Sequence, residues 1–422
     1  MEALKVKFLG GVEAIGKSAV LVETGEARIL LDYGVAIDHV PSFPMHVPPK
    51  DLDAVVLTHG HLDHCGATPI LYIRGRIPVY ALPATFDLAE ILIKDFLRLS
   101  GYYLPYEFLD MRSMISHSVP VKYGEEVRVK DATVRFLNSG HILGSSQVVV
   151  RDKTSAVLYT SDMNTADTNL LRMADRDYGD LDAAVIESTY ALEEHPVREE
   201  LEKSFVARLY RVMERRGIAL IPAFSVGRSQ EILCVLEKYG FEYPVTVDGM
   251  AVEANEVFLK HLENLRDPEL FKRALGMADW VSGWKERKAI LKKPGVIVAP
   301  AGMLRGGLAV FYAERLARAP QNAIFLVSFQ IPGTPGRVLQ ETGMFMIHGK
   351  TRKVEAEVHK FDFSSHSGMS GLHETVKNFR GSPTVFPIHG EKQSCRGLAD
   401  WARENGLKTV LPRIGDTYEV PG

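Results

Sequence analysis

The chain has 422 residues, of which 46% are hydrophobic and 24% are charged. These fractions are typical of globular proteins and exclude a disordered, collagen-like or fibrous chain. Lysine and arginine number 50 against 53 aspartate and glutamate residues, a net charge of −3, which excludes a uniformly basic nucleic-acid coat but not a local basic groove.

The cysteine count and the absence of long apolar segments indicate the compartment. Three cysteines (Cys65, Cys234 and Cys395) are too few for a disulfide scaffold and suit a reducing environment. The first residues contain no apolar stretch typical of a signal peptide. No apolar run approaches the roughly 20 residues that a membrane helix needs. We therefore expect a cytoplasmic protein with no membrane contact.

The first third of the chain is predicted to form mainly short strands. Apolar or alternating runs bounded by glycine and charged residues favour strands, and one longer stretch has the period of a helix. The expected strands span 4–9, 18–22, 29–31, 54–57, 127–137, 147–150, 156–159 and 183–186, and the expected helix spans 84–99.

The middle of the chain alternates helices with buried strands. We expect helices over 198–215 and 227–239, and strands over 218–221, 245–247, 295–299 and 323–327. This alternation favours a parallel sheet of α/β type. From about residue 354 the pattern is predicted to return to short strands. Because no linker-like segment separates the two kinds of pattern, we expect one domain to be inserted into another.

The loop after the predicted strand 54–57 carries the strongest chemical signal. It contains His59, His61, Asp63 and His64 within six residues. Imidazole and carboxylate groups together suit Zn²⁺. On an extended turn, positions 59 and 61 share one side, whereas 63 and 64 can turn toward a second point. The spacing therefore fits two metal ions, which lie about 3.5–4 Å apart in two-metal hydrolases.

Each metal needs further ligands, and three candidates follow predicted strands or apolar runs: His141, Asp162 and His389. Asp32 also ends a strand, where it could orient a ligand histidine through a hydrogen bond. Cys65, next to the loop, is expected to be a small buried residue rather than a ligand.

The segment His59-Gly60-His61-Leu62-Asp63-His64 resembles the signature of the metallo-β-lactamase superfamily. Asp32, His141 and Asp162 match its other motifs in order and context. Further similarity to the β-CASP family of nucleases lies at Glu187, His366, His389, 222–231 and 301–307. The resemblance implies an α/β fold, in which a metallo-β-lactamase αββα sandwich (1–189 and 348–422) carries an inserted β-CASP domain (190–347) with a mainly parallel sheet.

The resemblance also implies two Zn²⁺ ions and their ligands. One ion would be held by His59, His61 and His141, the other by Asp63, His64 and His389, with Asp162 bridging both. A hydroxide between the ions would attack a phosphodiester. His366, oriented by Glu187, would protonate the leaving 3′ oxygen, so the products would carry 5′-phosphate and 3′-hydroxyl ends.

The same resemblance favours single-stranded RNA as substrate, in RNA processing or decay, because family members with histidine at the position of His389 act on RNA. Gly368 stands where eukaryotic members usually carry an acidic residue. Compact prokaryotic members tolerate glycine at this position. Endonuclease and 5′→3′ exonuclease activity both stay open, as does assembly into a homodimer or an RNA-processing complex.

Three other functions are compatible with parts of this sequence. One is a single-stranded DNA nuclease, and another is an inactive scaffold subunit of an RNA-processing complex, which the complete ligand set disfavours. The third is a small-molecule hydrolase such as a lactonase, against which the inserted domain counts.

Candidate RNA contacts lie outside the metal ligands. Arg228 and Arg305 are expected to bind phosphates, because a guanidinium presents a two-pronged donor and neighbouring glycines let the backbone approach closely. Ser364 and Ser365 either hold a phosphate or form a turn. The basic run 285–293 either follows an RNA backbone or is a solvated face.

Overall fold

The computed structural model describes residues 3–37, 40–100, 103–331 and 333–421. The chain divides into two compact units. The first comprises Met1–Asp167, Arg172–Glu194 and Ser365–Gly422, and the second Thr168–Leu171 and His195–Ser364. From the sequence, residues 348–364 were expected to belong to the metallo-β-lactamase domain. In the structure they belong to the second unit, because β21 (Glu357–Lys360) pairs with β18 (Ala323–Leu326) of its sheet.

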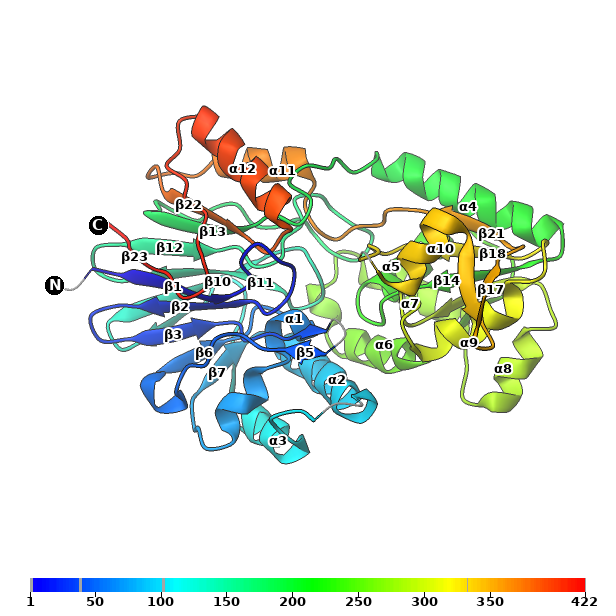
Figure 1. Ribbon diagram of the computed structural model, residues 1–422, viewed down its shortest axis with the longest axis horizontal. Coiled ribbons are helices and arrows are strands. Elements are labelled where there is room, and N and C mark those ends of the chain that lie inside the picture. The colour runs from blue at the N-terminus through cyan, green and yellow to red at the C-terminus, as the bar shows by residue number, and fades with distance from the viewer. Residues whose placement is uncertain (1–2, 38–39, 101–102, 332, 422) are drawn as a thin grey trace. The chain divides into compact units, whose positions relative to one another are not determined.

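The first unit is built on two sheets (Figure 1). In spatial order, the seven-stranded sheet consists of β23 (Thr417–Glu419), β1 (Lys5–Gly10), β2 (Ala19–Glu23), β3 (Arg28–Leu31), β6 (Ala54–Val56), β7 (Val79–Ala81) and β8 (Ser118–Pro120). The six-stranded sheet consists of β22 (Thr384–Ile388), β13 (Ala183–Glu187), β12 (Ala156–Tyr159), β11 (Ser146–Arg151), β10 (Ala132–Asn138) and β9 (Glu126–Val129). Separately, β4 (Ala36–Ile37) pairs antiparallel with β5 (Pro41–Ser42).

Alternating side chains of these strands fill three apolar layers. Between the sheets, Phe8 and Val20 of one pack in the same core as Phe136 and Val148 of the other. Outside the seven-stranded sheet lie α1 (Leu62–Cys65), α2 (Pro83–Leu99) and α3 (Phe108–Ser116). Outside the six-stranded sheet lie α11 (Met369–Lys377) and α12 (Lys392–Glu404). This order of layers confirms the predicted αββα sandwich.

Two local predictions differ from the structure. The segment 127–137 is a hairpin of β9 and β10 rather than one strand, because the chain turns at Lys130, whose φ is +52°. The return to short strands after residue 354 is confirmed only in part, since β21, β22 and β23 lie there but so do the helices α11 and α12. In α12 the buried residues are Cys395, Leu398, Ala399 and Ala402, which is the spacing of one helix face.

The second unit contains a six-stranded sheet in which every neighbouring pair is parallel, as predicted. Its spatial order is β16 (Ala278–Trp280), β15 (Val245–Val247), β17 (Gly295–Ala299), β14 (Ile218–Pro222), β18 and β21. Its helices are α4 (Arg198–Glu214), α5 (Arg228–Lys238), α6 (Met250–Lys260), α7 (Pro268–Gly276), α8 (Trp284–Ile290), α9 (Gly307–Leu316) and α10 (Pro335–Thr342). A hairpin of β19 (Met344–Ile347) and β20 (Lys350–Lys353) packs beside α9 and α10.

Successive residues of β18 show how helices cover both faces of this sheet. Phe325 meets Phe205 of α4, with ring centroids 5.7 Å apart. Ile324 and Leu326 point the other way, into the core that contains Tyr312 of α9. Such parallel sheets, buried on both faces, typically place their loops and ligands at the strand ends.

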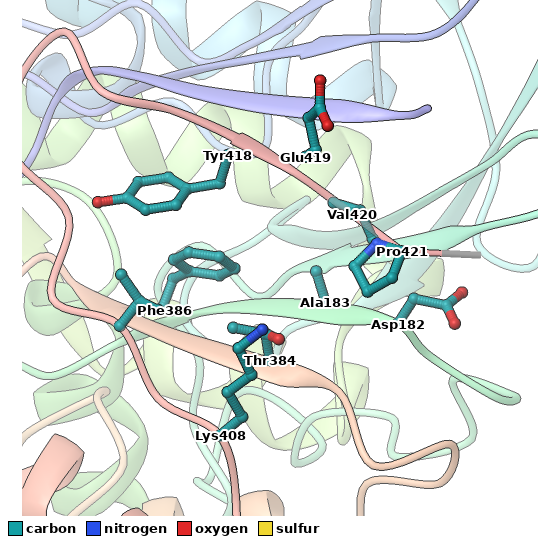
Figure 2. A pocket seen from close by; sticks show the side chains of 10 residues that line it. Asp182, Ala183, Thr384, Phe386, Lys408, Tyr418, Glu419, Val420 and Pro421 are labelled. Atoms are coloured by element: carbon teal, nitrogen blue, oxygen red, sulfur yellow. The ribbon is translucent and has the colours of Figure 1, made fainter. Parts of the chain in front are cut away.

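A small cavity in the first unit is too confined for a substrate. It lies between β23 and the β13–β22 pair and is bordered by Phe386 and Tyr418 (Figure 2). Its volume is about 50 Å³, room for a few water molecules of roughly 10–15 Å³ each. No helix in the described ranges is both long and apolar enough to span a membrane.

The core between the two sheets leads to a stability prediction. Phe136 is fully buried there, so Phe136→Ala should leave a cavity and lower the free energy of unfolding of the first unit by about 3–5 kcal/mol. Thr133, on the opposite face of the same strand and partly exposed, gives the control, for which we expect less than about 1 kcal/mol. Urea denaturation followed by circular dichroism measures both. Equal midpoints for the two variants would contradict the packing described.

Candidate metal centre

Strand ends deliver the polar side chains of the first unit to one place. Asp32 follows β3, Ser161 and Asp162 follow β12, and His389 follows β22. Asp32, Ser161 and His389 adopt left-handed backbone angles, with φ of +58°, +50° and +48°. Residues other than glycine rarely do so, and such conformations, which cost on the order of 1 kcal/mol, concentrate at functional sites. The backbone is thus bent at three strand ends that carry predicted site residues.

The histidine-rich loop is held in position by the segment after β3. His59 precedes α1, whereas Asp63 and His64 lie within its single turn. The Tyr33 and Val35 amides donate hydrogen bonds to the carbonyl oxygens of His64 and Leu62. Between them, a Cβ atom on Gly34 would lie 1.7 Å from a backbone oxygen, so only glycine allows this close approach.

All seven predicted metal ligands come together in two groups that share Asp162. The first cluster contains His59, His61, His141 and Asp162, and the second cluster contains Asp63, His64, His389 and Asp162. Within each cluster, one ligand atom per residue lies within 4.8 Å of the others. The two-point geometry expected from the loop is therefore present.

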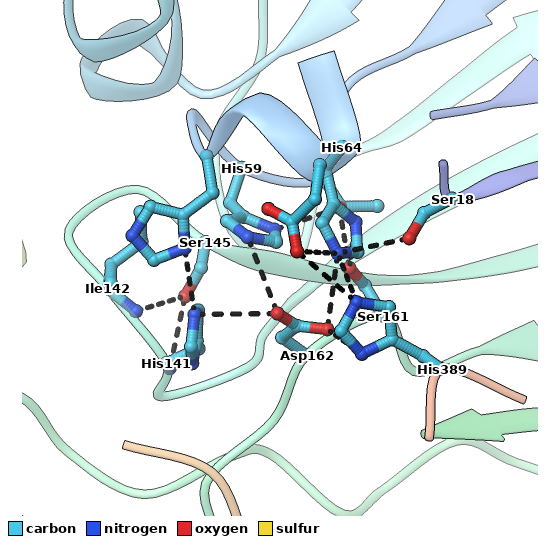
Figure 3. Close-up of polar contacts among 12 residues, drawn as sticks. Ser18, His59, His64, His141, Ile142, Ser145, Ser161, Asp162 and His389 are labelled. Atoms are coloured by element: carbon cyan, nitrogen blue, oxygen red, sulfur yellow. Dashed lines mark hydrogen bonds and ion pairs between the residues drawn. The ribbon is translucent and has the colours of Figure 1, made fainter. Parts of the chain in front are cut away.

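The two oxygens of Asp162 face different clusters (Figure 3). Oδ2 lies 3.7 Å from His59 Nε2 and 3.6 Å from His141 Nε2. Oδ1 lies 3.2 Å from His64 Nε2 and 3.2 Å from His389 Nδ1. The carboxylate is 2% exposed, so its charge must be compensated by these neighbours or by a cation.

The donor atoms of both clusters fit bound cations. Within the described residues, His59 Nε2 and Asp162 Oδ1 are buried and form no well-oriented hydrogen bond, although ring nitrogens lie near Oδ1, and most buried polar atoms in proteins have one. His141 Nε2 lies only 3.2 Å from His61 Nδ1, and His64 Nε2 lies 3.3 Å from His389 Nε2. Pairs of ring nitrogens at such distances, with carboxylates beside them, form the nitrogen and oxygen ligand set that suits zinc.

Asp32 fixes the orientation of His64, as the sequence suggested. Its Oδ2 accepts a hydrogen bond of 2.7 Å from His64 Nδ1, which leaves Nε2 of that ring as the ligand atom. The same carboxylate accepts bonds from the Thr58 hydroxyl (2.7 Å) and the Tyr159 hydroxyl (3.0 Å). The Thr58 hydroxyl also contacts the Ser161 hydroxyl. Sequence reasoning missed Thr58, Tyr159 and Ser161, because no motif distinguishes them from other residues in or near strands.

Burial sets the protonation states of the first cluster. It lowers the pKa of His59 and His141 well below the ordinary value, and that of His61 to about 4. These rings are therefore neutral near pH 7, the form that binds metals. Burial opposes ionisation of Asp162, but His389 and His64 hold the pKa of its carboxyl group well below the usual range.

A histidine–carboxylate pair lies beside the clusters. His366 Nδ1 is 3.0 Å from Glu187 Oε1, and its Nε2 is 4.0 Å from Asp162 Oδ2. Glu187 is buried at the end of β13, where its Oε1 also accepts a bond from the Met163 amide. Burial lowers the pKa of His366, but the Glu187 and Asp162 carboxylates raise it to about 9 overall. The ring thus holds a proton at neutral pH on the side that faces the clusters.

The other predicted residues occupy varied positions. Ser365 contributes its carbonyl oxygen, 2.9 Å from His141 Nδ1, and so orients a candidate ligand. Ser364 ends the second unit, in which Arg228 begins α5 and is buried, and Arg305 is exposed before α9. The thiol of Cys65 is buried and donates to the Gly60 carbonyl, outside both clusters.

Comparison with known proteins identifies similar chains. Residues 13–191 match the metallo-beta-lactamase superfamily, 229–339 the Beta-Casp domain, and 351–412 the Zn-dependent metallo-hydrolase RNA specificity domain. RNase aCSPSF2 of Saccharolobus solfataricus is 40% identical over 98% of this chain and 85% of its own length. Probable RNase MJ4 of Methanocaldococcus jannaschii is 34% identical over 99% of this chain and 100% of its own.

Two further matches extend the comparison. The transcription termination factor FttA of Pyrococcus horikoshii is 35% identical over 99% of this chain and 71% of its own length. A solved structure of a protein of unknown function from Enterococcus faecalis V583 matches with a TM-score of 0.63 at 17% identity, covering 99% of both chains. At that identity the structure supports the fold alone.

The hydrogen bond between Asp32 and His64 leads to a prediction about metal affinity. Asp32→Ala should free the His64 ring and weaken zinc binding at the second cluster by about 10- to 100-fold. Competition with a chromophoric zinc chelator measures the affinity. Asp182→Ala, which removes a similar acceptor at the Ala156 amide, is the control and should retain zinc. Unchanged affinity in Asp32→Ala would show that this carboxylate does not orient a ligand.

Proposed function

This chain belongs to the β-CASP family of the metallo-β-lactamase superfamily and is a metal-dependent hydrolase of the ribonuclease class, and we propose that it cleaves single-stranded RNA with two zinc ions. The single observation that carries the proposal is the shared Asp162, whose two oxygens face two separate ligand clusters. Cleavage would leave 5′-phosphate and 3′-hydroxyl ends.

In this proposal each cluster holds one ion. His59, His61 and His141 would hold the first, Asp63, His64 and His389 would hold the second, and Asp162 would be available to both. When bound, the two ions activate a water molecule and neutralise charge that develops on the phosphate. Asp32 and the Ser365 carbonyl hold the rings of His64 and His141 with their ligand nitrogens turned inward.

His366 is proposed as the general acid. Its Nε2 faces the clusters, and the Glu187 carboxylate on the opposite nitrogen favours the protonated ring. A proton on Nε2 can therefore pass to the 3′ oxygen as the phosphodiester bond breaks. Glu187 positions the ring and, through the Met163 amide, is itself fixed at the end of β13.

RNA is favoured as substrate by the relatives and by the matched domains. Two relatives that align over nearly the whole chain are named ribonucleases, and the RNA specificity domain at 351–412 includes His366 and His389. Arg228, Arg305, Ser364 and Ser365 are proposed to contact phosphates of the bound strand. Internal cleavage and 5′→3′ degradation are both compatible with this site.

We also propose that the enzyme acts in the cytoplasm. Three buried cysteines without disulfides suit the reducing cytoplasm, where RNA processing and decay take place. We further propose that the chain acts as a homodimer or within an RNA-processing complex, and light scattering of the purified protein tests the first of these.

The activity is tested with one RNA labelled separately at its 5′ and 3′ ends. We expect cleavage by the wild type, complete loss after zinc chelation, and a loss of at least about 10³-fold in Asp162→Ala, because both metals lose a ligand. Internal fragments would indicate an endonuclease, whereas mononucleotides released from the 5′ end would indicate an exonuclease. Cleavage that persists without metal would contradict the mechanism.

A matched DNA strand in the same reaction separates the substrate alternatives. We expect RNA to be cut in preference to DNA of the same sequence. Preferential cleavage of DNA would favour the single-stranded DNA nuclease. The absence of cleavage of either strand, with zinc bound, would favour the scaffold alternative.

The pair of His366 and Glu187 predicts a change in pH dependence. A general acid works when protonated, so the rate is full below its pKa and falls as the pH rises through it. Removing the carboxylate in Glu187→Gln lowers the pKa of His366, so the alkaline fall in kcat should begin at lower pH than in the wild type. His366→Ala should lower kcat by about 10²–10⁴-fold. Zinc content is the control, and an unshifted alkaline limb would exclude this role of Glu187.

A further inference from the structure

A basic hollow lies in the second unit at the amino ends of β14 and β17. Its volume is about 350 Å³, and buried Ile218 and Leu316 border it. No carboxylate from the described residues lines the hollow. Four of its lining residues are cationic, namely Arg216, Lys292, Lys293 and Arg315. A cavity with charge of a single sign concentrates the potential that attracts a polyanion.

Topology explains why basic residues gather here. A helix that connects parallel strands runs back against them, so its carboxyl end reaches the amino edge of the sheet. Helix ends of this kind favour cations, and Arg216, Lys292 and Arg315 each lie at or just beyond the end of α4, α8 or α9. The helix dipoles explain why cations lie at these helix ends. They do not explain why the ends surround a hollow or why no acidic residue lines it.

The cations in the hollow are largely uncompensated. Within the described residues, the side chains of Arg216, Lys292 and Lys293 form no hydrogen bond or ion pair, and Lys292 and Lys293 are exposed. Their charges are therefore available to an outside ligand. Arg315 instead places its guanidinium 3.7 Å from the centroid of the Phe311 ring.

An exposed aromatic side chain continues this surface beyond Arg315. This side chain is Trp284, which packs edge to face against Phe311 with ring centroids 5.2 Å apart. Trp284 is 57% exposed, which is unusual for the largest aromatic side chain. Hollow, guanidinium and indole are thus linked by consecutive contacts.

The helix that carries Trp284 is anchored by an ion pair. None of the side chains of α8 is fully buried, so apolar packing alone does not hold it. Arg287 donates to both oxygens of the buried Asp248, at 2.8 and 2.9 Å, and its guanidinium lies 4.9 Å from the Trp284 ring centroid. The Tyr312 hydroxyl also donates to Asp248, at 2.6 Å. The indole is therefore presented outward from a fixed position.

We propose that this amino-edge surface (Arg216, Trp284, Lys292, Lys293 and Arg315) binds single-stranded RNA outside the metal centre. Phosphates contact the cations, and a base stacks on Trp284. Interleaved cations and aromatic rings are the pattern of sequence-tolerant binding to single strands. The inference rests on the proposed function, since it assigns a second contact for the same substrate.

The test measures RNA binding by fluorescence anisotropy, with every variant built in Asp162→Ala so that the strand stays intact. Lys292→Glu with Lys293→Glu should weaken binding of a labelled oligouridine at least tenfold. The slope of log K against the logarithm of the salt concentration should become shallower by about 0.7 for each lost phosphate contact. Arg208→Glu with Arg211→Glu, two exposed cations of α4, makes the same change in charge and should alter binding less than threefold.

A second variant tests stacking separately from charge. Trp284→Ala should weaken binding about fivefold or more, and Trp284→Phe should restore part of it. The midpoint of thermal unfolding should stay unchanged, which distinguishes a binding role from a structural one. A polyglutamate peptide that displaces RNA at equal charge concentration would overturn the proposal in favour of an acidic protein partner.

Wild-type cleavage, measured in parallel, separates this inference from the proposed function. Cleavage with equal binding by the two double variants would overturn the inference alone. Selective loss of binding without wild-type cleavage would overturn the nuclease function and support the surface. Neither cleavage nor a difference in binding would overturn both.

Discussion

A buried carboxylate that must be shared between two groups of histidines is the constraint on which the rest of this structure depends. Asp162 is 2% exposed, and an isolated charge at such depth would be very unfavourable. The imidazoles around it offset the free energy of burying this charge only if they and the carboxylate are held at fixed positions, with cations completing the balance of charge. The left-handed backbone angles at the strand ends and the close backbone contact at Gly34 both help to hold these side chains in position.

The sandwich explains how distant segments reach the same carboxylate. The histidine loop leaves the seven-stranded sheet after β6, whereas Asp162 and His389 leave the six-stranded sheet after β12 and β22. The strands that end at the site run parallel to neighbours in their own sheets, so their carboxyl ends meet at one edge. Each cluster combines ligands from both sheets, so the apolar core between the sheets sets how closely these ligands approach one another. Stability and chemistry are therefore coupled in the first unit.

The candidate metal ligands that the structure brings together could be found from the sequence because each belongs to a short, recognisable segment. Four ligands lie within six residues, and the others each follow a predicted strand or an apolar run. Glu187 had no such signal, since an acid after a strand is common, and only the family resemblance singled it out. The hydroxyls of Thr58 and Tyr159 join the network through contacts across the fold, which spacing in sequence does not encode.

The predicted elements show the same division between local and distant information. Buried strands with apolar runs were located to within a few residues, whereas α12 was missed despite the helical spacing of its apolar side chains. The basic run 285–293 was ambiguous in sequence. Its meaning depends on Arg216 and Arg315, which only the parallel sheet brings beside it.

We have proposed that Asp162 contacts two zinc ions. Anomalous diffraction at the zinc absorption edge, from crystals grown with zinc, tests it most directly. We expect two peaks about 3.5–4 Å apart. Each should lie about 2.0–2.2 Å from a different oxygen of Asp162. A single peak, or two peaks of which one does not touch Asp162, would contradict it.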